Sequence, residues 1–149
     1  MENNKLIKIL PLFGILIFLV YSVISFLQPV RDEYKLKNDV SFEGVVTDFD
    51  RSSGSHGFGI VTVKITKSNT KIFNAFQKEK VYPYTINGSN GEIYNYIPST
   101  LKIGDKVNVN SKKNEISYYE NNKFLSKEIL FIIKDENEIE LIKKVKRLN

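Results

Sequence analysis

The feature that most constrains this chain is an uncharged, largely apolar run near its start, residues 9–27. At a helical rise of about 1.5 Å per residue the run reaches roughly 28 Å, close to the ~30 Å hydrocarbon thickness of a bilayer. A helix in a soluble core is rarely apolar on every face. The run therefore predicts a transmembrane signal-anchor within residues 1–29, followed by a charged linker at residues 30–39.

A cleaved secretory signal peptide is the alternative for this run. Lys5 and Lys8 precede it, and Val23-Ile24-Ser25 offers a candidate small-residue cleavage site. The apolar core of a signal peptide is typically about 7 to 15 residues, which is shorter than this run, so an uncleaved anchor is favoured. A lipoprotein is excluded because the chain has no cysteine to carry the lipid.

The charges on the two sides of the run nearly balance. Lys5 and Lys8 stand before it, and Arg31, Lys35 and Lys37 follow it. An N-terminal anchor before a long domain usually leaves its N-terminus in the cytoplasm. We therefore expect a single-pass protein of the bacterial inner membrane, with its C-terminal domain periplasmic or otherwise extracytoplasmic.

Four of the five net positive charges of the chain lie at its C-terminal end, and the fifth comes from the N-terminal flank. Residues 31–142 carry 16 Lys or Arg and 16 Asp or Glu, whereas Lys143, Lys144, Lys146 and Arg147 are unopposed. A nucleic-acid-binding domain needs a basic working face, so a nucleic-acid partner is not expected for a neutral domain. The four basic residues are candidates for contact with anionic lipid headgroups, and the alternative is a helix whose basic face is solvated.

Alternating apolar residues predict one mainly antiparallel β domain at residues 40–149. Turn-forming residues separate the segments, as in hairpins. Residues 67–80 are ambiguous and are interpreted as a loop with a possible short helix. The continuous apolar run at residues 129–133 is typical of a buried central strand. The expected strands lie at residues 40–49, 58–65, 81–86, 92–97, 107–109, 116–118 and 129–133.

The last 15 residues, about 135–149, have the pattern of an amphipathic helix. Asp135 can cap its start, with Glu138 three positions on. Leu141, Val145 and Leu148 share one face at i, i+4 and i+7. This helix is expected to pack its apolar stripe on the β domain.

Few residues point to catalysis or metal binding. Asp48, Asp50 and His56 are weak candidates for metal ligands, because one imidazole without cysteine cannot build a closed zinc site. His56 is also the single imidazole that could activate a serine, and Ser55 lies in no nucleophile-elbow motif. The sequence therefore predicts no cofactor, no metal and no enzymatic activity.

Tyrosines gather in the predicted hairpin at residues 81–97. Tyr82, Tyr84, Tyr94 and Tyr96 occupy alternate positions of its two strands. Such residues can line an open face on which glycan or nucleic-acid rings stack. Cross-strand packing explains them equally well.

Several short motifs resemble a group of small membrane-anchored or secreted bacterial envelope proteins of unknown function. The resemblance covers residues 40–119 and rests on Ser41-Phe-Glu-Gly-Val-Val-Thr-Asp, His56-Gly before Ile60-Val-Thr-Val, Leu101-Lys-Ile-Gly-Asp-Lys-Val, and Tyr118-Tyr119. It implies a compact OB-like β-barrel and no particular activity.

Three functions follow from this sequence. The favoured one is a non-enzymatic accessory or interaction module of the cell envelope, with a protein partner. A β-barrel that binds glycan or nucleic acid on its tyrosine-rich face is the first alternative. A hydrolase is the least supported.

Overall fold

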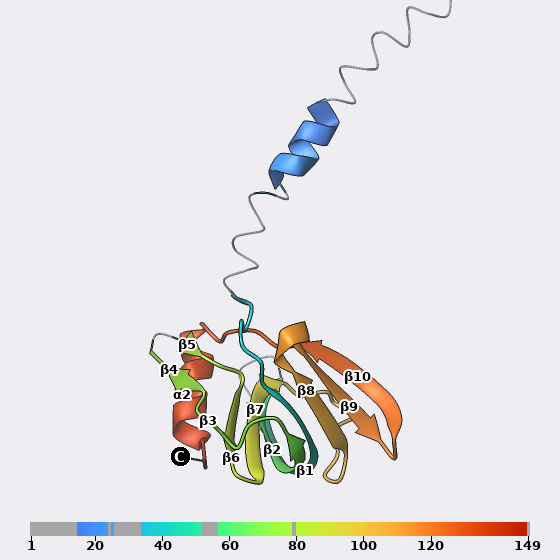
Figure 1. Ribbon diagram of the computed structural model, residues 1–149, viewed down its shortest axis with the longest axis vertical. Coiled ribbons are helices and arrows are strands. Elements are labelled where there is room, and N and C mark those ends of the chain that lie inside the picture. Colours follow the sequence, from blue (N-terminus) through green and yellow to red (C-terminus); the bar gives the residue numbers. More distant parts are fainter. Residues whose placement is uncertain (1–14, 24, 26–33, 52–56, 79, 149) are drawn as a thin grey trace, which may run out of the picture. The chain divides into compact units, whose positions relative to one another are not determined.

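The computed structural model describes residues 15–23, 25, 34–51, 57–78 and 80–148 (Figure 1). Contacts divide the chain into two units, Met1–Tyr34 and Lys35–Asn149. In the first unit, residues 15–23 and 25 are helical and their side chains are exposed. No helix within the described residues has both the length and the apolar character needed to cross a bilayer.

This finding contradicts the predicted transmembrane signal-anchor, and with it the single-pass inner-membrane location and the extracytoplasmic side assigned to the C-terminal domain. The hydropathy of residues 9–27 suggested a continuous span, but the described helical stretch is much shorter. The remainder of that run, residues 9–14, 24, 26 and 27, lies outside the described residues. So does Ile24, the centre of the candidate cleavage site.

The second unit is built on an antiparallel sheet whose strand order is β10-β9-β8-β1-β2-β7-β6-β3 (Figure 1). A separate two-stranded sheet pairs β4 with β5, and one 3-10 turn and one helix complete the unit. The elements in chain order are β1 (Ser41–Arg51), β2 (Phe58–Ser68), β3 (Ile72–Phe73), β4 (Phe76–Gln77), β5 (Lys80–Val81), β6 (Tyr84–Asn87), β7 (Asn90–Tyr96), β8 (Lys106–Asn110), η1 (Ser111–Lys113), β9 (Glu115–Glu120), β10 (Lys123–Ile129) and α2 (Glu136–Val145).

The predicted OB-like β-barrel is wrong, because the sheet of the described residues is open, with β10 and β3 at its two edges. Closure would require these edges to pair along their length. The edge strand β3 has only two residues. The other edge, β10, has a register shift between Phe124 and Ser126, and a bulge with lysines is a common device against edge pairing.

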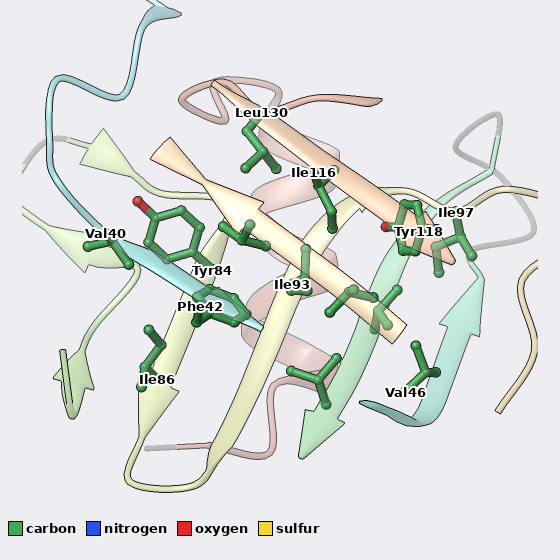
Figure 2. Packing of buried hydrophobic residues seen from close by; sticks show 14 of the residues in the cluster. Val40, Phe42, Val46, Tyr84, Ile86, Ile93, Ile97, Ile116, Tyr118 and Leu130 are labelled. Atoms are coloured by element: carbon green, nitrogen blue, oxygen red, sulfur yellow. The ribbon is translucent and has the colours of Figure 1, made fainter. Parts of the chain in front are cut away.

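The inner face of the sheet carries the larger hydrophobic core. Side chains from β1, β2, β6, β7, β8 and β9 converge there, as Figure 2 shows for Phe42, Tyr84, Ile93, Ile116 and Tyr118. The period-two alternation produces this face, since every second residue of each strand points to the same side. Leu130 and Ile132, beyond the last strand, also belong to this core.

The outer face of β2 and β7 carries a second, smaller core beneath α2 and the β4–β5 pair. It contains Phe58, Ile60, Tyr94 and Ile142, all nearly inaccessible to solvent. Figure 1 shows α2 at the end of the sheet opposite to β9 and β10. The helix thus covers only one part of the outer face.

The C-terminal helix begins at the position that its capping pattern predicts. Asp135 Oδ1 accepts hydrogen bonds from the backbone N–H groups of Asn137 (2.9 Å) and Glu138 (3.1 Å). These bonds satisfy amide groups that have no partner within the first turn. Ile142 is fully buried against the sheet, as expected for an amphipathic helix.

The structure differs from the predicted strands in several places. Most of β10 was not predicted, and the strand predicted at residues 81–86 is divided between β5 and β6. The described residues between 67 and 80 form no helix. They contain the end of β2, both β3 and β4, and the first residue of β5. The predicted central strand at residues 129–133 is also wrong: β10 ends at Ile129, and Leu130, Ile132 and Ile133 are buried outside the main sheet. An apolar run signals burial, but a buried connecting segment gives the same signal as a buried strand.

Candidate functional site

The four predicted ligand-binding tyrosines do not share one face. The register pairs Tyr84 with Ile93, so Tyr84 lies on the inner face, whereas Tyr94 lies on the outer face beneath α2. Both are buried, at 0% and 1% exposure. Burial raises the pKa of Tyr84 to about 12, even though its hydroxyl bonds to Asn38 Oδ1 at 2.9 Å. These two rings belong to the cores.

Tyr82 and Tyr96 are the accessible members of the set. Tyr96 is 40% exposed, and its hydroxyl donates to Glu138 Oε1 (3.2 Å). Tyr82 is half-buried against Phe73, with ring centroids 5.3 Å apart, and lines a shallow hollow of about 660 Å³. The other residues of that hollow are long and flexible: Gln77, Lys78 and Lys80. Ligand binding at either tyrosine stays a prediction.

Two of the three weak metal candidates, Asp48 and Asp50, lie within the described residues. Asp48 forms an ion pair with Arg147 Nη1 and accepts a hydrogen bond from the backbone N–H of Phe49. The hydrogen bond from Arg147 holds the pKa of Asp48 below its ordinary value. Asp50 is exposed, and His56 lies outside the described residues. Within the part of the chain that is described, no three His, Cys, Asp or Glu side chains gather as metal ligands do.

The four basic residues predicted to contact lipid have two kinds of environment. Lys143 and Lys144 are exposed in the last turn of α2, where a positive charge complements the helix dipole. Lys146 Nζ lies 5.3 Å from the centre of the Phe76 ring, and Arg147 pairs with Asp48. The last two therefore attach the C-terminal segment to the β domain.

A buried hydrogen-bond network, which the sequence did not predict, lies beneath the segment that follows α2. Glu92 is fully buried and accepts hydrogen bonds from Tyr94 Oη on one oxygen, and from the backbone N–H groups of Arg147 (2.8 Å) and Leu148 (3.1 Å) on the other. Tyr94 Oη also bonds to Thr85 Oγ1 at 3.0 Å. The sequence signal that could have revealed these bonds is Glu92 itself, a charged residue inside an otherwise uncharged strand and two positions before Tyr94.

The part of the outer face that α2 leaves uncovered carries a different kind of surface. There β1, β8 and β9 present polar and aromatic side chains around an open depression of about 530 Å³, which we call the outer hollow. Its volume lies within the range typical of small-molecule sites, about 300–1,000 Å³. It is lined by Glu43, Gly44, Val45, Thr66, Lys106, Val107, Asn108, Tyr119 and Asn122.

Strand pairing places these residues in cross-strand rows. Val45 lies opposite Lys106, which lies opposite Tyr119, while Glu43 lies opposite Asn108 in the neighbouring row. Directly opposed residues of an antiparallel pair point to the same face. The lining therefore comes mainly from paired strands of the central sheet, which hold side chains more rigidly than loops do.

The β9–β10 hairpin completes one end of the outer hollow. Asn121 and Asn122 have φ angles of 49° and 64°, so both residues of the two-residue turn are left-handed, as a type I′ turn requires. The turn places Asn122 at the hollow, where Lys106 Nζ donates to Asn122 Oδ1 at 2.5 Å. Tyr119 packs edge-on against Phe124, with ring centroids 5.9 Å apart.

The charged groups around the outer hollow bond to both charged and neutral partners. Glu43 lies 3.6 Å from Lys67 Nζ, and Lys64 Nζ donates to Ser89 Oγ at 2.9 Å. The lining itself contains one carboxyl group, Glu43, and one lysine, Lys106. The lining of the outer hollow thus offers polar contacts and carries no net formal charge.

No family model, curated protein or solved structure matches this chain.

Proposed function

We propose that this protein is a non-enzymatic binding module whose ligand occupies the outer hollow. The observation that carries this proposal is the uncovered outer face of β1, β8 and β9, where Tyr119 and several polar side chains surround one depression. The remaining outer face, on β2 and β7, is occupied by α2 and the β4–β5 pair. A half-exposed aromatic ring among polar groups is typical of recognition surfaces.

The chemistry of the lining favours binding over hydrolysis. Glycoside hydrolysis needs two carboxyl groups a few ångströms apart, and the lining of the outer hollow supplies only Glu43. A nucleophile needs a neighbouring base. The aliphatic hydroxyl of the lining, Thr66 Oγ1, instead donates to the backbone carbonyl of Glu43 at 3.2 Å. These side chains can hold a ligand, but they form no acid–base or nucleophile–base pair.

The outer hollow is favoured over the hollow beside Tyr82 because of how each is built. The outer hollow is lined mainly by β1, β8 and β9, strands of five to eleven residues within the main sheet. The hollow beside Tyr82 is lined by residues in and around β4 and β5, which have two residues each. A site on long, paired strands keeps its geometry without a ligand, which lowers the entropic cost of binding.

The test compares two tyrosine variants of the full chain on one immobilised panel of glycans, peptides and oligonucleotides. Tyr119→Ala should weaken, about tenfold, the binding of whichever probe the wild-type chain retains. Tyr96→Ala removes an accessible tyrosine outside the outer hollow and should leave that binding intact. Thermal unfolding of both variants checks that each is folded. Binding that survives Tyr119→Ala but is lost in Tyr96→Ala would refute the proposal.

A further inference from the structure

We infer that the ligand of the outer hollow is an uncharged oligosaccharide that stacks on the Tyr119–Phe124 pair; this inference rests on the proposed function. Three features of the described residues support it: an exposed aromatic pair, a set of amide and carboxyl groups beside it, and the absence of net charge from the lining. Each feature corresponds to one chemical property of a neutral sugar chain.

The aromatic pair offers a platform for the apolar face of a sugar ring. Phe124 is 60% exposed, and it lies directly opposite Tyr119 in the β9–β10 pairing. The register shifts after Phe124. Phe124 pairs with Tyr119 and Ser126 pairs with Tyr118, so Leu125 between them has no pairing partner on β9. Bulges of this kind re-aim side chains at functional surfaces. The pair presents aromatic surface to solvent beside the outer hollow.

The polar groups of the lining suit hydroxyl groups, which both donate and accept hydrogen bonds. An asparagine side chain has two N–H donors and a carbonyl acceptor, and a carboxyl group accepts on both oxygens. Asn108 is exposed and forms no side-chain hydrogen bond among the described residues, so its amide is available to a ligand. Asn122 also lines the depression, and because its Oδ1 accepts from Lys106 Nζ, its amide donors are not used in that bond.

The charge pattern argues against a phosphate-bearing or otherwise anionic ligand. Nucleic acid binding depends on lysines and arginines that neutralise phosphates. Here Lys106 bonds to Asn122, Lys67 lies beside Glu43, and Lys102 Nζ donates to Glu120 Oε1 at 2.6 Å. An anion would have to compete with these contacts and would also meet the carboxyl group of Glu43.

A second depression extends the surface along the same strands, which favours an oligosaccharide over a single sugar. It has a volume of about 310 Å³ and shares Glu43 and Asn108 with the outer hollow. Ser41, Asn69 and Asn110 continue its polar lining, which also contains Lys67, the ion-pair partner of Glu43. At about 3.4 Å per residue, the stretch of β1 from Ser41 to Val45 spans roughly 14 Å, which exceeds one sugar ring.

The experiment is calorimetric titration of the full chain with three uncharged oligosaccharides, cellotetraose, chitotetraose and mannotetraose. Tetragalacturonate and an oligothymidylate serve as anionic probes. We expect at least one uncharged probe to bind with a Kd that is unchanged between about 50 and 500 mM NaCl. Tyr119→Ala and Phe124→Ala should each weaken that binding about tenfold. Ile72→Ala, which truncates an exposed apolar side chain on β3, is the matched control.

The possible outcomes distinguish a failure of the oligosaccharide assignment from a failure of the proposed binding function. Salt-sensitive binding of an anionic probe in the titrations, or binding of only a peptide on the immobilised panel, overturns the glycan assignment. If Tyr119→Ala weakens that binding, the outer hollow remains the binding site. Failure of all three uncharged oligosaccharides overturns the inference as well. If no glycan, peptide or oligonucleotide binds in a Tyr119-dependent way, the inference and the proposed function both fall.

Discussion

Glu92 Oε1 accepts a hydrogen bond from the backbone N–H of Arg147 across 2.8 Å, although 54 residues separate the two in sequence. Leu148 donates to the same oxygen, and Tyr94 Oη donates to the other. A carboxyl group inside a central strand thus holds the segment that follows α2. This connection keeps the helix over β2 and β7 and away from the outer hollow.

Replacement of Glu92 by alanine should destabilise the domain by about 3 kcal/mol, because it leaves one hydroxyl and two backbone N–H groups without their acceptor. Urea unfolding of the full chain measures this change. Glu115→Ala is the control, since Glu115 makes ion pairs with Lys113 and Lys127 at the surface and should change stability by less than about 1 kcal/mol. Equal effects of the two substitutions would contradict the role given to Glu92.

Two buried tyrosines should respond in opposite ways to loss of their hydroxyl groups. Tyr84 Oη bonds to Asn38, so Tyr84→Phe should lower stability by about 1 kcal/mol. Tyr118 Oη is buried without a partner among the described residues, and burial raises the pKa of Tyr118. Tyr118→Phe should therefore be neutral or stabilising. A clear loss of stability in Tyr118→Phe would show that an ordered water or another group satisfies that hydroxyl.

The pH dependence of stability should include a component from Glu138. Burial raises the pKa of Glu138, so the folded state keeps this proton at pH values where the unfolded chain has released it. The stabilisation is complete below the unfolded pKa and is lost as the pH rises through the folded pKa. Glu138→Gln, whose carbonyl can still accept from Tyr96, should remove this loss and raise the unfolding temperature at neutral pH. An unchanged pH profile would contradict this assignment.

Asp48 should contribute with the opposite sign. Its hydrogen bond from Arg147 lowers the pKa of Asp48, so the stabilisation is present above the unfolded pKa and is lost as the pH falls through the folded pKa. Asp48→Asn should lower the unfolding temperature at neutral pH and have little effect in acid. Because the pair is exposed, the change should be small. An effect of the same size at both ends of the pH range would exclude this ion pair as its cause.

Local pattern predicted the strands well where one face is buried. The alternation of Val61, Val63 and Ile65 marks β2, and the capping residue Asp135 marks the start of α2. The Asn-rich turn between residues 87 and 90 closes the β6–β7 hairpin as expected, although it is shorter than predicted. These features depend on neighbours in sequence, which periodicity and turn chemistry report directly.

The face on which each tyrosine lies depends on register, which the sequence leaves open. A shift of one residue moves every side chain of a strand to the opposite face. The predicted tyrosine face assumed that Tyr84 and Tyr94 share a side, but the pairing of Tyr84 with Ile93 separates them. The outer hollow likewise depends on the pairing of β1 with β8, which brings Val45 opposite Lys106. No local pattern reports such a long-range contact.

Chemical-shift mapping of the ¹⁵N-labelled full chain, titrated with cellotetraose, chitotetraose and mannotetraose in turn, tests the central claim most directly. The account predicts that amide shifts for a binding sugar concentrate at residues 43–45, 106–108 and 119–122, around the outer hollow. Shifts confined to the surroundings of Tyr82 and Tyr96, or no shifts with any of the three sugars, would contradict it.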